Sequence, residues 1–284
     1  MNFAGLHLDL TYPHVMGILN ITPDSFSDGG ELLCDNGRVD IDKSLRRAEQ
    51  MCKDGASFLD LGGESTRPGA QTVSLQQEID RVLPVIEAIR NNLDICISVD
   101  TSSPELMQAA IEAGAGLIND VRALQKDNAL RVLAQSSVPV CLMHMQGEPG
   151  TMQEQPVYED VLGEVLSFLE ARVDACRQAG ISEERIIIDP GFGFGKDLNH
   201  NLELLNRLSE FKQLELPLLV GMSRKRMLGA VTGRPEKDRK AAGIAAAVLA
   251  LMQGASIIRT HDVAETHDAM KLFQALRAQS LKSI

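Results

Sequence analysis

Polar side chains with the chemistry of a binding site stand at the ends of short apolar runs in this sequence. Asp100, Asn119 and Asp189 each end such a run, and they offer carboxylate and amide groups with no cation among the three. A carboxylate can accept two parallel hydrogen bonds from neighbouring N–H groups. The set therefore favours a flat, neutral heterocycle rich in N–H donors, such as a 2-amino-4-oxopyrimidine ring, with Lys225 as a donor to a ring carbonyl or nitrogen.

A second group of residues favours an anion. Arg259 and His261 stand two positions apart at the end of the last run, directly before a predicted helix. Phosphate is often bound at this corner of a barrel, against a helix N-terminus. Asn20 ends the first run and can give one oxygen ligand to Mg²⁺, which usually keeps its waters and bridges to substrate phosphates. The two groups together predict a donor-rich heterocycle joined to a pyrophosphate.

Several of these residues have a simpler interpretation when each is taken alone. An isolated Asp between a strand and a helix is more often a helix cap than a ligand, and His144 between two methionines is more often packed than ligating. The glycine-rich GFGFGK at 191–196 is not a phosphate-binding loop, since Lys196 stands where GxxxxGK[ST] needs glycine. The functional interpretation rests on polar residues at the ends of all eight runs.

The alternation of apolar runs and amphipathic stretches along the chain predicts the strands and helices that position these residues. Short apolar runs that suit buried parallel strands alternate with amphipathic stretches that suit helices. The runs cover 14–20, 57–63, 94–100, 115–120, 138–144, 185–191, 217–223 and 255–261. Eight strand–helix units in 284 residues predict an α/β fold, a (β/α)₈ TIM barrel forming a single domain over 1–284. An open doubly wound sheet is the structural alternative, and residues 1–12 are predicted to form a short N-terminal extension, a hairpin across the barrel floor.

Composition limits the classes of partner. The net charge of −11 argues against a nucleic-acid or anionic-membrane binder, because both need a basic face. Five cysteines without a CxxC motif predict buried, reduced thiols. The N-terminus has no basic segment followed by a long apolar stretch. We therefore expect a cytoplasmic protein with no nucleic-acid or membrane partner.

Eight motifs carry a close resemblance to the bacterial dihydropteroate synthase family. They are MGILNITPDSFSDGG (16–30), DLGGESTRPGA (60–70), ISVDTSSPE (97–105), GLINDVRAL (116–124), PVCLMHMQG (139–147), IIIDPGFGFGK (186–196), LLVGMSRK (218–225) and IIRTHDV (257–263). The resemblance covers every strand end in the family's order. It implies a folate-pathway transferase on a TIM barrel that condenses (7,8-dihydropterin-6-yl)methyl diphosphate with 4-aminobenzoate, giving 7,8-dihydropteroate and pyrophosphate.

The resemblance also implies a role for individual residues. The pterin would be held by Asp100, Asn119, Asp189 and Lys225, with Met143 and Gly221 as pocket wall and Arg259 stacked on the ring. The diphosphate would meet Asn20, Arg259 and His261, with Asn20 also the Mg²⁺ ligand. The aminobenzoate would be surrounded by Thr66, Arg67, Pro68, Phe194 and Ser223. The resemblance assigns catalysis to Asp189, Lys225, Arg259 and His261. It further implies a homodimer that pairs through its late helices, and inhibition by sulfonamides, which mimic 4-aminobenzoate.

Three other functions remain open on the sequence alone. A pterin-binding methyltransferase barrel would share the Asp and Asn residues of the pterin site but would not need Arg67, Arg259 and His261. A non-catalytic ligand-binding barrel would be expected to lose Asn20, Arg67 or Lys225, and all three are present. An aldolase barrel would use Lys225 as a Schiff base, whereas an aromatic amine is itself an uncharged nucleophile and needs no covalent enzyme intermediate.

Overall fold

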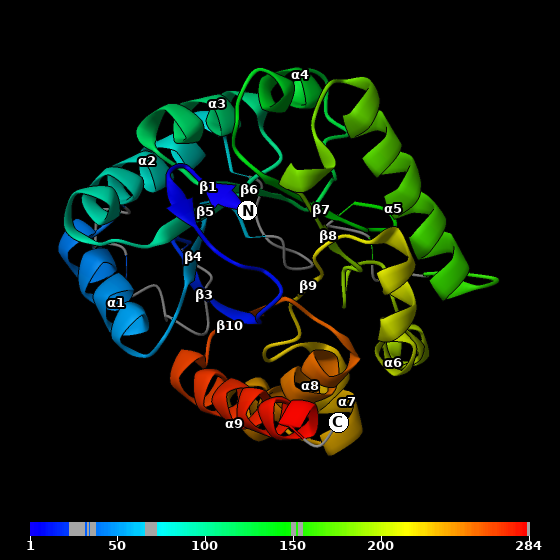
Figure 1. Cartoon of the computed structure of the whole chain (residues 1–284). Coiled ribbons are helices and arrows are strands. Elements are labelled where there is room, and N and C mark those ends of the chain that lie inside the picture. Colours follow the sequence, from blue (N-terminus) through cyan, green and yellow to red (C-terminus); the bar gives the residue numbers. More distant parts are fainter. Residues whose placement is uncertain are drawn as a thin grey trace.

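The computed structural model describes residues 1–22, 32, 34, 38–65, 73–148, 152 and 156–282, and in this part the chain forms a barrel of parallel strands inside a ring of helices (Figure 1). The barrel strands are His14–Asn20 (β3), Phe58–Gly62 (β4), Cys96–Asp100 (β5), Leu117–Asp120 (β6), Val140–Met143 (β7), Ile186–Asp189 (β8), Leu219–Val220 (β9) and Ile257–Thr260 (β10). Each lies within one of the eight predicted runs. Strand β9 is shorter than its run, which begins at Pro217, a residue with no N–H to give to the ladder.

Helices follow every barrel strand, as the alternating pattern predicts. The α-helices are Ile41–Lys53 (α1), Leu75–Asn92 (α2), Pro104–Ala113 (α3), Ala129–Ala134 (α4), Val161–Gln178 (α5), Leu198–Asn206 (α6), Arg226–Thr232 (α7), Lys240–Gln253 (α8) and Val263–Lys282 (α9). Short 3₁₀ turns cover Glu183–Arg185 (η1), Leu208–Leu214 (η2) and Glu236–Asp238 (η3). Local chemistry sets their starts: at α2 the Ser74 hydroxyl accepts from the Gln77 N–H, and the Gln77 side chain accepts from the Ser74 N–H.

The sheet closes on itself. Its strand order is β8-β7-β6-β5-β4-β3-β10-β9. The two ends then meet where the Ile188 N–H donates to Pro217 O at 3.0 Å, beside a parallel bridge between Ile188 and Leu218. This closure confirms the TIM barrel and excludes the open doubly wound sheet.

The floor of the barrel is a small apolar cluster that the N-terminal residues cover. Strands Asn2–Phe3 (β1) and Leu6–His7 (β2) pair as an antiparallel hairpin, and the N-terminus lies over the barrel in Figure 1. Phe3 packs edge-on against Phe58 at 5.0 Å between ring centroids. The cluster contains one inward residue from each barrel strand: Met16, Phe58, Cys96, Leu117, Cys141, Ile187, Leu219 and Ile257. The predicted hairpin across the floor is therefore confirmed.

A second, larger core lies between strands and helices. Because side chains alternate across a strand, Leu59 and Leu61 of β4 point outward, as do Ile97 and Val99 of β5. They meet apolar residues of the helix ring, such as Ile86 of α2. The alternation leaves every second position of each strand facing the barrel axis, and these positions above the floor carry the polar residues described below.

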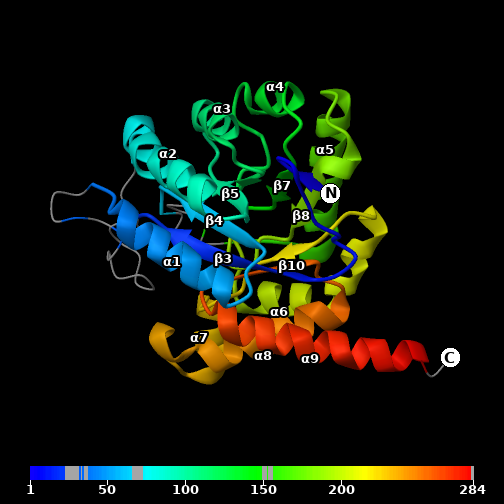
Figure 2. The same cartoon turned by 60° about the vertical axis from the view of Figure 1, so that its left-hand side comes forward.

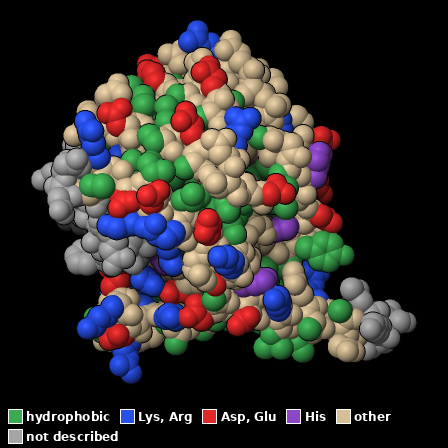
Figure 3. Space-filling model, turned by 90° about the vertical axis from the view of Figure 1, so that its left-hand side faces the viewer, with side chains coloured by type: hydrophobic (Ala, Val, Ile, Leu, Met, Phe, Trp, Pro, Cys, Tyr) green, Lys and Arg blue, Asp and Glu red, His purple; other side chains and the backbone are tan. Residues whose placement is uncertain are grey.

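The surface of the molecule carries both charged and apolar side chains (Figure 3). On the face shown in Figure 3, acidic and basic side chains are interspersed between apolar ones. Helices α7, α8 and α9 lie together on one side of the barrel (Figure 2). No helix in the described residues is long and apolar enough to cross a membrane. The five cysteines are free, and Cys96, Cys141 and Cys176 are buried as predicted, but the prediction of buried thiols is wrong for Cys34, which is exposed, and for Cys52, which is half-buried.

Candidate active site

A layer of polar residues lies directly above the apolar floor of the barrel. Each follows a floor residue by two positions on the same strand, so its side chain also points inward. We call the set the polar layer: Asp60 of β4, Ser98 of β5, Asn119 of β6, Asp189 of β8 and Arg259 of β10. In the register of the sheet Asp60 stands opposite Ser98. One further inward step along β5 places Asp100 at the strand end, opposite Asn119.

Arg259 joins carboxylates from two strands. Its Nε donates to Asp60 Oδ2 at 2.5 Å, and its Nη2 donates to Asp100 Oδ2 at 3.0 Å. The Asp60 carboxylate also accepts from Ser98 Oγ at 2.5 Å and from Asn119 Nδ2 at 3.1 Å. Because the side chain of Asp60 is fully buried, these bonds fix the position of both the guanidinium and the amide.

Sequence reasoning missed Asp60 and Ser98. Neither ends an apolar run, and in a barrel the residues expected to act are those at the strand ends. A signal was present, because Asp60 is a charged residue inside an otherwise apolar strand and stands two positions before Gly62. The same two-residue step separates Ser98 from Asp100. Counting back two positions from Asp100 would have found Ser98, and the charge of Asp60 inside an apolar strand is its own signal.

Burial dominates the electrostatics of the two site carboxylates. It raises the pKa of Asp100 to about 7, although Arg259 favours the charged form, and the neighbouring Asp60 raises the pKa further. Burial also raises the pKa of Asp189, against the opposing effects of Lys225 and of the Gly191 N–H, which donates to Asp189 Oδ1 at 2.7 Å. A ligand that donates hydrogen bonds to these oxygens favours the ionised form of each.

Lys225 reaches the same space from the end of β9. Its Nζ donates to Phe192 O and lies 4.6 Å from the centroid of the Phe194 ring. Burial lowers its pKa to about 8, while Asp189 favours the ammonium. The structure thus brings Lys225 and Phe194 together, one predicted for the pterin and the other for the aminobenzoate.

The predicted anion corner is built from the ends of β9 and β10. Ser223 Oγ accepts from the His261 N–H at 3.2 Å and lies 3.1 Å from His261 Nδ1. Helix α9 begins two residues later at Val263. The buried Asp262 at this helix start pairs with Arg224 at 2.7 Å, so its negative charge is compensated beside the predicted anion site.

The remaining predicted residues that the structure describes line the same end of the barrel. Met143 is buried on β7 opposite Asp189, and a Cβ added to Gly221 would lie 3.7 Å from Arg259 Cβ. Asn20 ends β3 opposite Gly62, where an added Cβ would lie 3.6 Å from Asn20 Oδ1. The predictions for Thr66, Arg67 and Pro68 fall outside the described residues.

A Mg²⁺ ion at this end of the barrel would be coordinated jointly by the protein and the substrate. Within the described residues there is no group of three or more His, Cys, Asp or Glu side chains that could hold a metal. Asn20 offers a single hard oxygen beside the bare backbone of Gly62. One protein oxygen suits Mg²⁺ when substrate phosphates and water complete its shell.

Comparisons with known proteins agree with this geometry. The family described as "Pterin binding enzyme" matches residues 16–261. The chain is 52% identical to the dihydropteroate synthase of Escherichia coli K12 over 95% of its own length and 94% of that protein. It superposes on the Yersinia pestis enzyme in a sulfonamide complex with a TM-score of 0.92 at 50% identity, covering 98% of this chain and 100% of the other. The Xanthomonas albilineans enzyme in complex with 7,8-dihydropteroate gives a TM-score of 0.85 at 40% identity and covers 97% of each chain. The chain therefore belongs to the pterin-binding enzymes and, among them, to the dihydropteroate synthases, the transferases of folate synthesis.

Proposed function

We propose that the polar end of this barrel binds (7,8-dihydropterin-6-yl)methyl diphosphate and 4-aminobenzoate and joins them to 7,8-dihydropteroate, releasing pyrophosphate. The observation that carries the proposal is the placement of Arg259 between the fully buried carboxylate of Asp60 and the half-buried carboxylate of Asp100, with Asn119 bonded to Asp60. This arrangement offers fixed acceptors for a donor-rich ring and one cation within reach of both ring and diphosphate.

We propose that Asp100, Asn119 and Asp189 bind the N–H edge of the pterin, and that Lys225 donates to its ring carbonyl or nitrogen. Asp189 supports this role because its buried carboxylate keeps oxygen sites for an adjacent amino and ring N–H pair. Met143 and Gly221 form the pocket wall, and Arg259 covers the ring. The aminobenzoate lies against Phe194 and Ser223, while Thr66, Arg67 and Pro68 stay sequence predictions for the same substrate.

The reaction needs stabilisation of charge more than acid–base catalysis. The bond between the pterin methylene carbon and the diphosphate oxygen breaks with its electron pair on the diphosphate, and the amine lone pair forms the new C–N bond. The amine then loses a proton to solvent. Arg259, His261 and the first turn of α9 neutralise the leaving group. Asp189 stabilises the positive charge that develops on the pterin. In this scheme Asp189, Lys225, Arg259 and His261 are the catalytic residues.

Asn20 is the proposed protein ligand of Mg²⁺. When bound, Mg²⁺ would supply further neutralisation of the diphosphate as it leaves. The support for Asn20 is its oxygen chemistry and its place at the end of β3, next to Gly62.

We also propose that the chain acts as a single domain over 1–284 and as a homodimer. Leu249 and Met252 of α8 and Leu272 of α9 are large apolar residues with exposed side chains. They lie on neighbouring helices of one side of the barrel (Figure 2). A second copy covering this face would remove that apolar surface from water. The cytoplasmic location stays a prediction from the sequence.

The pH dependence of kcat/KM for the pterin substrate is expected to be bell-shaped, with its maximum between about pH 7 and 8. Below the pKa of Asp100, about 7, the carboxylate gains a proton and loses an acceptor for the pterin. Above the pKa of Lys225, about 8, the ammonium loses its charge. Initial rates across this range test the prediction, because kcat/KM reports ionisations of the free enzyme. A flat profile from about pH 6 to 9 would contradict the assigned roles of both groups.

Product analysis tests the proposed function directly. The protein with both substrates and Mg²⁺ is expected to form dihydropteroate and pyrophosphate in equal amounts, and a sulfonamide is expected to compete with 4-aminobenzoate. Methyl transfer from methyltetrahydrofolate, without pyrophosphate release, would instead support the methyltransferase barrel. Tight pterin binding without turnover would support the non-catalytic barrel.

A further inference from the structure

The buried lysine of the GFGFGK segment has no part in the chemistry proposed above. Lys196 is 2% exposed, and its Nζ lies in a ring of uncharged partners. It donates to Gly191 O and Phe194 O at 3.0 Å each and lies 2.8 Å from His144 Nδ1. Burying a lysine is costly, so the contacts that it makes need an explanation.

Those contacts hold a tight turn against the end of β7. Gly191 has φ +70°, and a Cβ there would lie 1.8 Å from His144 O. Gly195 has φ +60°, and a Cβ there would lie 2.3 Å from Gln146 O. Glycine is needed at both positions, since positive φ and close backbone approach leave no room for a side chain. Lys196 bonds to two carbonyls of the turn from inside.

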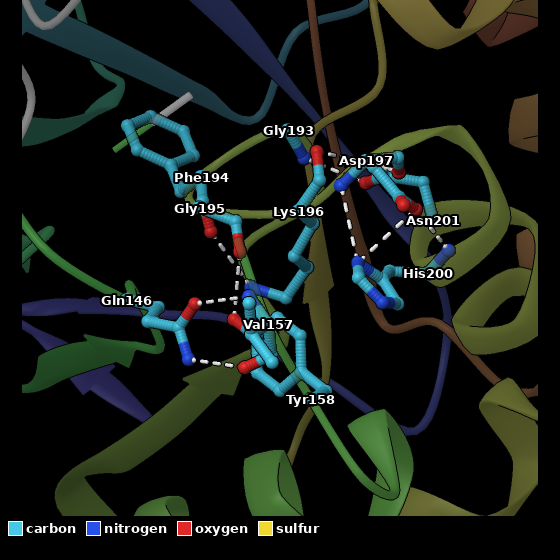
Figure 4. Close-up of polar contacts among 10 residues, drawn as sticks. All are labelled: Gln146, Val157, Tyr158, Gly193, Phe194, Gly195, Lys196, Asp197, His200 and Asn201. Carbon is cyan, nitrogen blue, oxygen red and sulfur yellow. Dashed lines mark hydrogen bonds and ion pairs between the residues drawn. The ribbon is translucent and has the colours of Figure 1, made fainter. Parts of the chain in front are cut away.

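Side chains from the surrounding elements hold the outside of the same turn (Figure 4). Tyr158 donates from its hydroxyl to Gly195 O at 2.8 Å. Asn201 of α6 accepts from the Gly193 N–H at 2.7 Å and donates to Lys196 O at 3.1 Å. Every carbonyl and amide used in this way belongs to residues 191–196, so the turn is fixed from both sides.

The turn carries groups that touch the proposed site. Phe192 O accepts from Lys225 Nζ, and the Phe194 ring lies 4.6 Å from the same nitrogen. The Gly191 N–H donates to Asp189 Oδ1 at 2.7 Å. Moving the turn would therefore move the partners of both Lys225 and Asp189.

We propose that Lys196 is a positioning residue for this reaction: its Nζ, held by His144, ties Gly191 O to Phe194 O and so fixes the Phe194 ring and Phe192 O around Lys225. His144 takes part as a neutral acceptor, because burial lowers its pKa to about 2. The proposal rests on the proposed function, since it assigns Phe194 to the aminobenzoate and Lys225 to the pterin.

Kinetics of Lys196→Met, which keeps an unbranched side chain one atom shorter and removes its donors, test the proposal. We expect KM for 4-aminobenzoate to rise by about tenfold or more, because small displacements of positioning groups have large effects. We expect kcat to fall as well, as Lys225 loses its fixed partners. Lys196→Gln, which has the same reach as Met but keeps N–H donors, should recover part of both losses.

Arg185→Met is the matched control. Arg185 is a cation at the opposite, amino end of β8, and its Nη2 donates to Leu133 O at 2.8 Å and Val138 O at 2.7 Å. Like Lys196 it donates to two carbonyls, but within the described part of the chain none of its hydrogen bonds is with a site residue. Both variants are expected to lower Tm, and only Lys196→Met should change the KM for 4-aminobenzoate.

The outcomes separate the two levels of the proposal. If Lys196→Met and Lys196→Gln keep the wild-type KM for 4-aminobenzoate, as Arg185→Met should, then Lys196 only stabilises the fold and the positioning role is wrong. If Lys196→Met does not fold, Lys196→Gln decides by the same comparison of KM. If the wild-type protein forms no dihydropteroate, the proposed function itself fails and the positioning role fails with it.

Discussion

Replacing Arg259 by alanine is expected to lower kcat/KM by at least ~10²–10³-fold, the loss typical for one donor to a developing anion. The guanidinium meets Asp60 at 2.5 Å and Asp100 at 3.0 Å, and the proposed scheme gives it the diphosphate as well. Its removal also leaves the fully buried Asp60 carboxylate without its cation, and breaking a buried pair costs about 3–5 kcal/mol of stability. We therefore expect a lower Tm together with the loss of activity.

Calorimetry of pyrophosphate binding separates these two effects. Arg259→Lys is the matched variant, because it keeps the charge and loses the planar fork that reaches both carboxylates. Arg259→Lys should retain part of the pyrophosphate affinity and lose most of the pterin affinity. Pyrophosphate that binds equally well to wild type and to folded Arg259→Ala would show that the anion site lies elsewhere.

Asp189→Asn is expected to lower kcat/KM for the pterin substrate by at least about tenfold. An amide has almost the size of the carboxylate but cannot accept two parallel bonds, and a hydrogen bond to a charged group is worth ~1.5–3 kcal/mol. The change also removes the negative charge next to the developing positive charge on the ring. Steady-state kinetics with the pterin as the varied substrate measure the effect.

Asp120→Asn provides the control for loss of a buried carboxylate. Asp120 is buried one residue after Asn119 on β6, and its carboxylate accepts from Ser102 Oγ at 2.5 Å and the Leu124 N–H at 2.7 Å. These partners belong to loops outside the polar layer, so Asp120→Asn should lower Tm and change the KM for the pterin much less than Asp189→Asn does. Equal kinetic effects of the two variants would remove Asp189 from the pterin site.

The fold was predictable because the barrel repeats one simple pattern. Buried parallel strands need continuous apolar runs, and all eight runs in the sequence became barrel strands. The polar residues that end these runs converge because the carboxyl ends of parallel strands meet on one face. For that reason Asp100, Asn119, Asp189 and Arg259 are predictable from the sequence.

The hydrogen bonds that connect the site residues to one another were not predictable in the same way. Sequence spacing separated a heterocycle group from an anion group, but Arg259 bonds to Asp100 and so links the two. Asp60 lies 199 positions from Arg259 along the chain, and only closure of the barrel brings them together. The GFGFGK segment does not match a nucleotide loop, and the role of Lys196 depends on backbone carbonyls that a sequence pattern does not show.

A crystal structure of this protein with the pterin diphosphate and without 4-aminobenzoate tests the central claim most directly. The account predicts the amino and ring N–H groups of the pterin against the Asp189 carboxylate and the Asn119 amide, with the diphosphate at Arg259 and His261. The ring edge would then contact residues from β6 and β8 together. A pterin bound away from these strand ends, or a diphosphate that does not reach Arg259, would contradict the account.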